Sequence, residues 1–178
     1  MSRTIHVVGT TLPSMPGWVP GPVRAYLAHT VGGQSIRALA RASDHHASTI
    51  LRQVRRMEGL RDDFLVDDAL RRLGCAACVP GPSDAKAKDV ERMSELMAIG
   101  AATPDEETVA REARRILRRM NEPGACLAVA RDMENAVVVR DTADGRTVRT
   151  AVVERAVAEA MVLKDWLSCA TSMAIQAR

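Results

Sequence analysis

Apolar residues recur at helical spacing through the first 73 positions of the chain. Ile50, Val54 and Met57 are separated by four and three residues, so they fall on one stripe of a helix. Ile36, Leu39 and Ala40 form a similar stripe a few positions earlier. The pattern predicts helices at residues 22–29, 36–41, 47–57 and 62–73, the first three forming a trihelical unit.

Signals at the ends of the second and third helices predict a tight turn between them. Ser35 precedes the second helix and is a good N-cap, because its hydroxyl can accept a hydrogen bond from a free backbone N–H. Asp44 lies in the break at residues 42–45, where the chain needs a residue that tolerates a left-handed backbone. His46 would be the N-cap of the third helix. The segment from Ser35 to Met57 therefore has the pattern of a helix-turn-helix.

The polar face of this segment has the chemistry of a DNA reader. Arginine guanidinium groups can bond to guanine edges and phosphates, and short hydroxyl side chains allow close approach in a major groove. We expect Arg37 and Arg41 to contact phosphates and Arg52 to contact a guanine. The alternative is an ordinary pair of helices with a solvated basic face. The candidate DNA-binding residues are Arg37, Arg41, His45, His46, Ser48, Thr49, Arg52, Gln53, Arg55 and Arg56.

Charge is distributed unevenly along the chain. The whole sequence has a net charge of +3, whereas residues 22–61 alone carry seven arginines and two acidic residues. Residues 62–178 are net acidic, at −3. The basic excess is concentrated on the helix-turn-helix, and we expect the remainder to bind phosphate weakly by itself.

The rest of the chain predicts further helices and a small sheet. The sequence Thr103-Pro104-Asp105-Glu106 resembles a capping box with proline at the first helical position, and it begins a helix that stops at Asn121. Short β-type runs follow at residues 127–130 and 136–139, with a hairpin turn at Asp144-Gly145. Other expected elements are helices at residues 83–97 and 153–167.

These elements define a mainly α fold with a small C-terminal α+β module. The module is compatible with a degenerate winged helix and with other α+β arrangements. The proline- and glycine-containing segment Val79-Pro80-Gly81-Pro82 marks the predicted domain boundary. The expected parts are a DNA-binding domain with an N-terminal arm at 1–74, a linker at 75–82, a helical hairpin at 83–124 and an interaction domain at 125–178.

Composition argues against several classes of protein. Only four residues are aromatic, which disfavours a base-stacking surface for RNA or single-stranded DNA. No apolar run is long enough for a membrane span or a signal peptide, so we expect a cytoplasmic, nucleoid-associated protein without a membrane partner. Cys75 and Cys78 form half of a zinc site or a redox couple, but the second half of a zinc site is missing and a thioredoxin-like motif would need a βαβ setting. With no phosphate loop and no nucleophile–base set, we expect neither an enzyme nor a bound metal or cofactor.

Several segments together resemble an alphaproteobacterial helix-turn-helix family associated with activation of gene transfer agents, the phage-like particles that package host DNA. The resemblance covers roughly residues 18–73 and 125–168, and it implies a transcription activator that binds promoter DNA and engages RNA polymerase. Members of that family also carry an uncharacterised C-terminal domain. The segments that carry the resemblance are residues 18–24, 35–41, 46–56, 61–63, 65–70, 133–141 and 163–166.

The leading hypothesis from the sequence is therefore a DNA-binding transcription activator. Its expected partners are double-stranded DNA, RNA polymerase and other transcription factors. The alternative is an RNA polymerase-associated interaction protein of the elongation or anti-termination type. Such a protein would bind DNA weakly or without sequence preference, so the salt dependence of duplex binding separates the two hypotheses.

Overall fold

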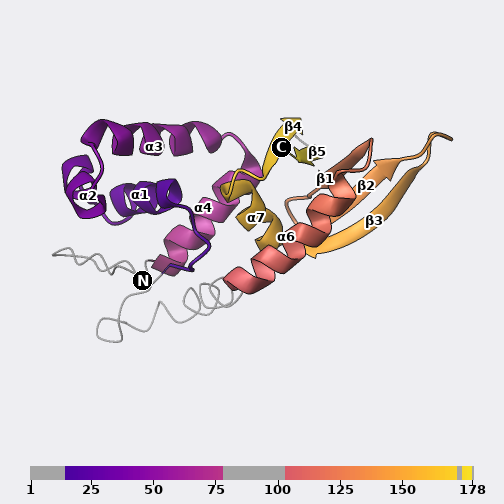
Figure 1. The fold of residues 1–178 in the computed structure, drawn as a ribbon, viewed down its shortest axis with the longest axis horizontal. Helices are drawn as coiled ribbons and strands as arrows, with labels where there is room; N and C mark the ends of the chain where they lie inside the picture. The colour runs from indigo at the N-terminus through magenta and orange to yellow at the C-terminus, as the bar shows by residue number, and fades with distance from the viewer. Residues whose placement is uncertain (1–14, 78–102, 172–173, 178) are drawn as a thin grey trace. The chain divides into compact units, whose positions relative to one another are not determined.

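The computed structural model describes residues 15–77, 103–171 and 174–177 of the chain. These residues form two compact units (Figure 1). Unit 1 contains the described residues up to Asp62 and those from Leu70 to Thr103. Unit 2 contains Asp63–Ala69 and the described residues from Pro104 onward. The fold is mainly helical, with one antiparallel sheet in the C-terminal part of the chain.

Unit 1 is built on three helices at the predicted places: α1 (Gly21–Thr30), α2 (Ile36–Ser43) and α3 (Ala47–Leu60). Each of the three packs against the other two. The predicted stripe of Ile50, Val54 and Met57 is buried, at no more than 4% exposure. The stripe faces a core that includes Trp18, Val23, Tyr26, Leu27 and Leu39.

The turn between α2 and α3 has the predicted caps. The Ser35 hydroxyl accepts a hydrogen bond from the Ala38 N–H at 3.2 Å. Asp44 ends α2 in the left-handed region, at φ 55° and ψ 40°. His46 is the N-cap of α3, and its Nδ1 accepts from the Ser48 N–H at 3.3 Å. Side-chain hydrogen bonds and one left-handed residue therefore fix where both helices begin and end.

The fourth predicted helix is α4 (Phe64–Ala77), and its expected end at Leu73 is wrong. Gly74, the residue after the predicted end, lies inside the helix. A Cβ at this position would be in van der Waals contact with the Val31 side chain at 3.4 Å and that of Leu27 at 3.6 Å. The helix therefore continues through a position that lies beside Leu27 of α1. The predicted linker at 75–82 begins within α4, and its remainder lies outside the described residues, as does the helix expected at 83–97.

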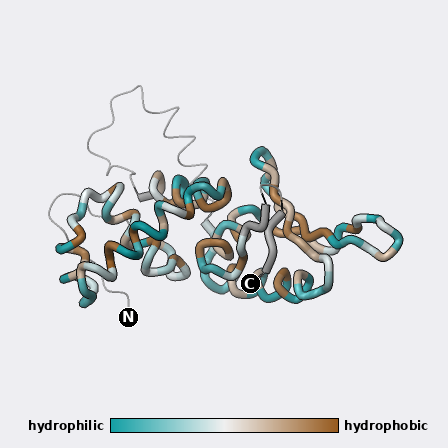
Figure 2. Tube along the Cα trace, turned by 90° about the horizontal axis from the view of Figure 1, so that it is seen from above, coloured by the Kyte–Doolittle hydropathy of each residue, from teal (hydrophilic) through white to brown (hydrophobic). Residues whose placement is uncertain are grey.

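Unit 2 contains α6 (Glu106–Met120), α7 (Arg155–Leu163) and a five-stranded antiparallel sheet of order β3-β2-β1-β5-β4. The expected runs at 127–130 and 136–139 correspond to β1 (Ala125–Ala128) and β2 (Asn135–Asp141). β3 (Thr147–Glu154) follows the predicted Asp144-Gly145 turn, where Gly145 has φ 75°. The turn is hydrophilic and the strands that lead to it are more hydrophobic (Figure 2).

One face of the sheet is buried under the two helices. Leu127 pairs with Val138, and Ala136 pairs with Val153, so the four side chains lie on one face, and each is at most 3% exposed. α6 and α7 contact each other and this sheet. The buried stripe of α6 is as predicted and consists of Val109, Ala113, Ile116 and Met120.

Two predicted helix ends in unit 2 are corrected. The N-cap of α6 is Asp105, not Thr103, since the Asp105 carboxylate accepts from the Thr108 N–H at 2.7 Å and Pro104 precedes the helix. The helix expected to reach Leu167 ends at Leu163. Asp165 adopts a left-handed backbone, at φ 62°, and the Trp166 N–H bonds to the Met161 carbonyl at 3.0 Å. Leu167 then begins a strand, β4 (Leu167–Thr171), which pairs with β5 (Ala174–Ala177).

Candidate nucleic-acid interface

The candidate DNA-binding residues lie on α2, α3 and the turn between them, which Figure 1 shows as neighbouring elements. The arginines, both histidines and Ser48 are exposed, whereas Thr49 and Gln53 are half-buried. Ile50, Val54 and Met57 occupy the opposite side of α3. The core stripe thereby sets which side chains of α3 point outward.

Four arginines on this surface are uncompensated. The guanidinium groups of Arg37, Arg41, Arg52 and Arg55 make no hydrogen bond or ion pair with any other residue that the structure describes. Neither α2 nor α3 has an acidic residue in its first turn. Their positive N-terminal ends therefore add to the arginine charge, and the surface favours an anion.

His45, His46 and Ser48 are occupied in shaping the turn. His45 Nδ1 donates to the Ser43 carbonyl at 2.6 Å. His46 Nδ1 lies 2.8 Å from the Ser48 hydroxyl, which donates to it, in addition to its capping bond. A neutral His46 then carries its proton on Nε2, the nitrogen on the outer edge of the ring. These three residues shape the turn and the start of α3. The sequence predicted the capping role of His46, but not the bonds made by His45 and Ser48.

Two arginines counted in the basic excess serve the fold. Arg24 donates to the carbonyls of Val19 at 2.9 Å and Pro16 at 2.6 Å, and so ties the segment before α1 to that helix. Arg61 donates to the Tyr26 hydroxyl at 3.2 Å. These two guanidinium groups are therefore less available to a ligand than those on α2 and α3.

The cysteines form no visible metal site. Cys75 lies inside α4 and Cys126 in β1, and both are free, half-exposed thiols. Cys78 lies outside the described residues, so the Cys75/Cys78 pair stays untested. Within the described ranges, no three histidine, cysteine or acidic side chains gather as metal ligands. No helix in those ranges is long and apolar enough to cross a membrane.

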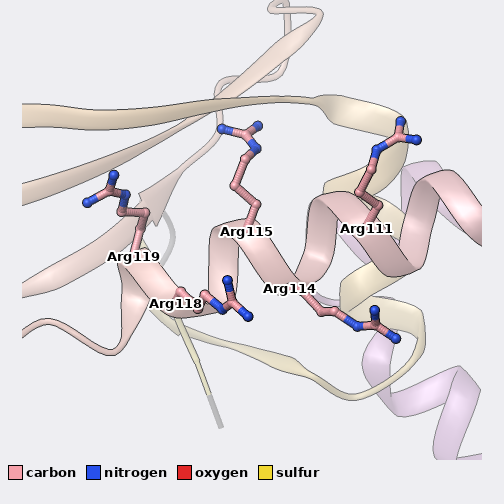
Figure 3. Close-up of a pocket in the computed structure, with 5 residues that line it drawn as sticks. All are labelled: Arg111, Arg114, Arg115, Arg118 and Arg119. Atoms are coloured by element: carbon pink, nitrogen blue, oxygen red, sulfur yellow. The ribbon is translucent and has the colours of Figure 1, made fainter.

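A second arginine cluster was missed in the sequence prediction. Five arginines of α6 line one shallow pocket on unit 2 (Figure 3). Summing charge over residues 62–178 concealed them, because acidic residues elsewhere outweigh them. Their spacing of three and four residues is the signal that could have revealed them. The lining residues are Arg111, Arg114, Arg115, Arg118 and Arg119.

Comparison with protein-family models, curated proteins and solved structures found no match to this chain.

Proposed function

We propose that α2 and α3 form a helix-turn-helix that binds duplex DNA, and that the protein is a transcription activator. The observation that carries the proposal is the arrangement of four uncompensated arginines on α2 and α3, opposite a buried stripe. Arginine forks match both phosphate oxygens and guanine edges. If this face were basic only to interact with solvent, lysine would be as suitable as arginine. Every basic residue in residues 22–61 is arginine.

The two helices have different roles in this proposal. α3 enters the major groove, with Arg52 and Arg55 at base edges and the half-buried Thr49 in close contact. α2 crosses the backbone, with Arg37 and Arg41 on phosphates. His46 holds the start of α3 so that its first turn faces the DNA.

The resemblance of the sequence to activators of gene transfer agents supplies the regulatory part of the proposal. On that basis the protein binds promoter DNA of gene transfer agent genes and engages RNA polymerase, and unit 2 is the partner-facing part. No catalytic activity is proposed.

The test is duplex binding by the full chain in a salt series, on the best site selected from random duplexes. Arg52→Ala should cost about 1–3 kcal/mol on that site and relax the preference at one base pair. Arg37→Ala should weaken binding about equally on all duplexes and lower the slope of log affinity against log salt by about one.

Arg146→Ala serves as the control, because this exposed arginine lies in the β2–β3 turn of unit 2 and belongs to neither α2 nor α3. The proposal fails if Arg52→Ala and Arg146→Ala bind the selected site equally well while both remain folded by circular dichroism. A chain with no selectable site but tight association with RNA polymerase would support the interaction-protein alternative.

A further inference from the structure

The arginines of α6 form two parallel rows on one exposed surface (Figure 3). Arg111, Arg115 and Arg119 are spaced by four residues, and so are Arg114 and Arg118. With a rise of about 1.5 Å per residue, neighbours in a row are roughly 6 Å apart along the axis. All five are exposed, with Arg111 at 65% and Arg119 at 56% of their side-chain area. We define these five residues as the α6 arginine surface.

Neighbouring acidic residues compensate only one of the two rows. Glu112 accepts from Arg115 at 2.8 Å and from Arg111 at 3.4 Å, and the Arg115 hydrogen bond lowers the pKa of its carboxyl group. Arg119 lies 3.6 Å from Glu122. No ion pair or side-chain hydrogen bond involves Arg114 or Arg118 within the part of the chain that the structure describes. These two guanidinium groups face solvent with their charge uncompensated.

The stability of α6 does not require this many arginines. Cations in the last turn favour the negative end of a helix, which accounts for Arg118 and Arg119. Arg111, Arg114 and Arg115 lie further from that end. The buried stripe lies on the opposite side of α6, and Arg115 donates to the Val152 carbonyl of β3 at 2.6 Å. Arg111, Arg114 and Arg118 make no such hydrogen bond with the described residues of the sheet, so this part of the outer side is free to serve a ligand.

The chemistry of the surface selects a polyanion with a regular backbone. Guanidinium groups pair with phosphates through two parallel bonds, and the two rows present them at repeated intervals. No aromatic residue occurs on α6, so the surface cannot stack unpaired bases. We propose that the α6 arginine surface binds the phosphate backbone of duplex DNA without reading its sequence. This proposal does not depend on the one made for α2 and α3.

The experiment compares two double variants of the full chain. Arg114→Gln/Arg118→Gln removes the uncompensated row. Arg146→Gln/Arg149→Gln removes the same charge from an exposed part of unit 2 around the β2–β3 turn. Binding to a random-sequence duplex is measured between about 50 and 200 mM salt, and thermal melting verifies that both variants fold.

We expect Arg114→Gln/Arg118→Gln to lower the salt slope by up to about two and to weaken binding at low salt at least tenfold. The control should change both quantities much less. The same loss should persist in an Arg52→Ala/Arg55→Ala background, which separates this surface from α3. Equal affinities for the two double variants would overturn the proposal. The proposal would also be overturned if Arg114→Gln/Arg118→Gln lost binding to polyglutamate while its duplex binding was unchanged. That result would assign the surface to an acidic protein.

Discussion

At the residue scale, Arg155 is the most heavily bonded side chain that the structure describes. It is 4% exposed and lies at the start of α7. Its guanidinium donates to the carbonyls of Ala130 and Arg131 at 2.7 Å each, and to Glu159 at 3.0 Å. It also pairs with Asp68 at 2.5 Å. One arginine thereby joins α4, α7 and the loop between β1 and β2 within unit 2.

Arg155→Ala should destabilise the protein by about 3–5 kcal/mol, because it breaks the buried ion pair with Glu159. Urea unfolding of the full chain measures the change. Arg146→Ala is the matched control, since its ion pair with Asp144 is exposed at 3.7 Å and should contribute under about 1 kcal/mol. A loss for Arg155→Ala as small as that of the control would contradict the structural role.

Single residues also explain which helix ends could be predicted from the sequence and which could not. Ser35 and His46 were identified as caps because capping depends on local sequence. The end of α4 was predicted too early, at Leu73, because the neighbours of the next position, Gly74, are Leu27 and Val31, far away in the sequence. The left-handed residue after α7 is Asp165. Glycine is the usual residue in this conformation, so the sequence did not indicate that the helix ends there.

At the element scale, helices with a clear apolar stripe were predictable, and the two short C-terminal strands were not. The sequence pattern placed α1, α2, α3 and the body of α6 because their stripes repeat over two or more turns. β4 and β5 escaped prediction because the spacing of Ala156, Ala160 and Leu163 extends to Leu167 by coincidence. For the candidate interface, the sequence identified the polar face of α3, but the local bonds of His45 and Ser48 required coordinates.

The turn between α2 and α3 gives a prediction that separates conformation from charge. Asp44→Gly removes the strain of a left-handed backbone and should stabilise unit 1 by up to about 1 kcal/mol. Asp44→Asn keeps a tolerated side chain but removes the negative charge beside the basic surface. Both variants should bind duplex DNA more tightly, and Asp44→Gly alone should melt appreciably later. Equal melting of the wild type and Asp44→Gly would show that the turn is unstrained.

The N-terminus of α6 should lose stability in acid. Hydrogen bonding to the Thr108 backbone holds the pKa of Asp105 below the ordinary range of an aspartate. A lowered pKa in the folded state means that the stabilisation is present above the unfolded pKa and is lost as pH falls through the folded pKa. Asp105→Ala should therefore lower the melting temperature at pH 7 and have little effect at pH 2. A difference that stays constant down to pH 2 would show that the charged carboxylate does not matter.

At the scale of the whole molecule, α4 belongs to both compact units. Its first residues, including Leu65, Val66 and Asp68, belong to unit 2, and Leu70 to Ala77 belong to unit 1. The sequence favoured a boundary at the proline- and glycine-containing segment after this helix, since such segments commonly separate domains. Any fragment that separates the units must therefore keep α4 intact.

The last prediction is that DNA binding and activation separate when the chain is cut after α4. A fragment of residues 1–77 retains all described elements of unit 1, including the buried Leu70 and Leu73, but lacks the α6 arginine surface. It should recognise the same duplex as the full chain, with a smaller salt slope because fewer phosphates are contacted. It should not activate transcription, and in excess it should compete with the full chain at the promoter.

The matched control is a fragment of residues 1–62, which lacks Leu70 and Leu73. It should be destabilised by several kcal/mol, because each of these leucines contributes about 1.5–3 kcal/mol when buried. Circular dichroism and urea unfolding distinguish the two fragments before binding is measured. Reporter transcription in cells that contain a target promoter then measures activation. Full activation by residues 1–77 would mean that unit 2 is not the part that engages RNA polymerase, and a salt slope equal to that of the full chain would argue against phosphate contacts by α6.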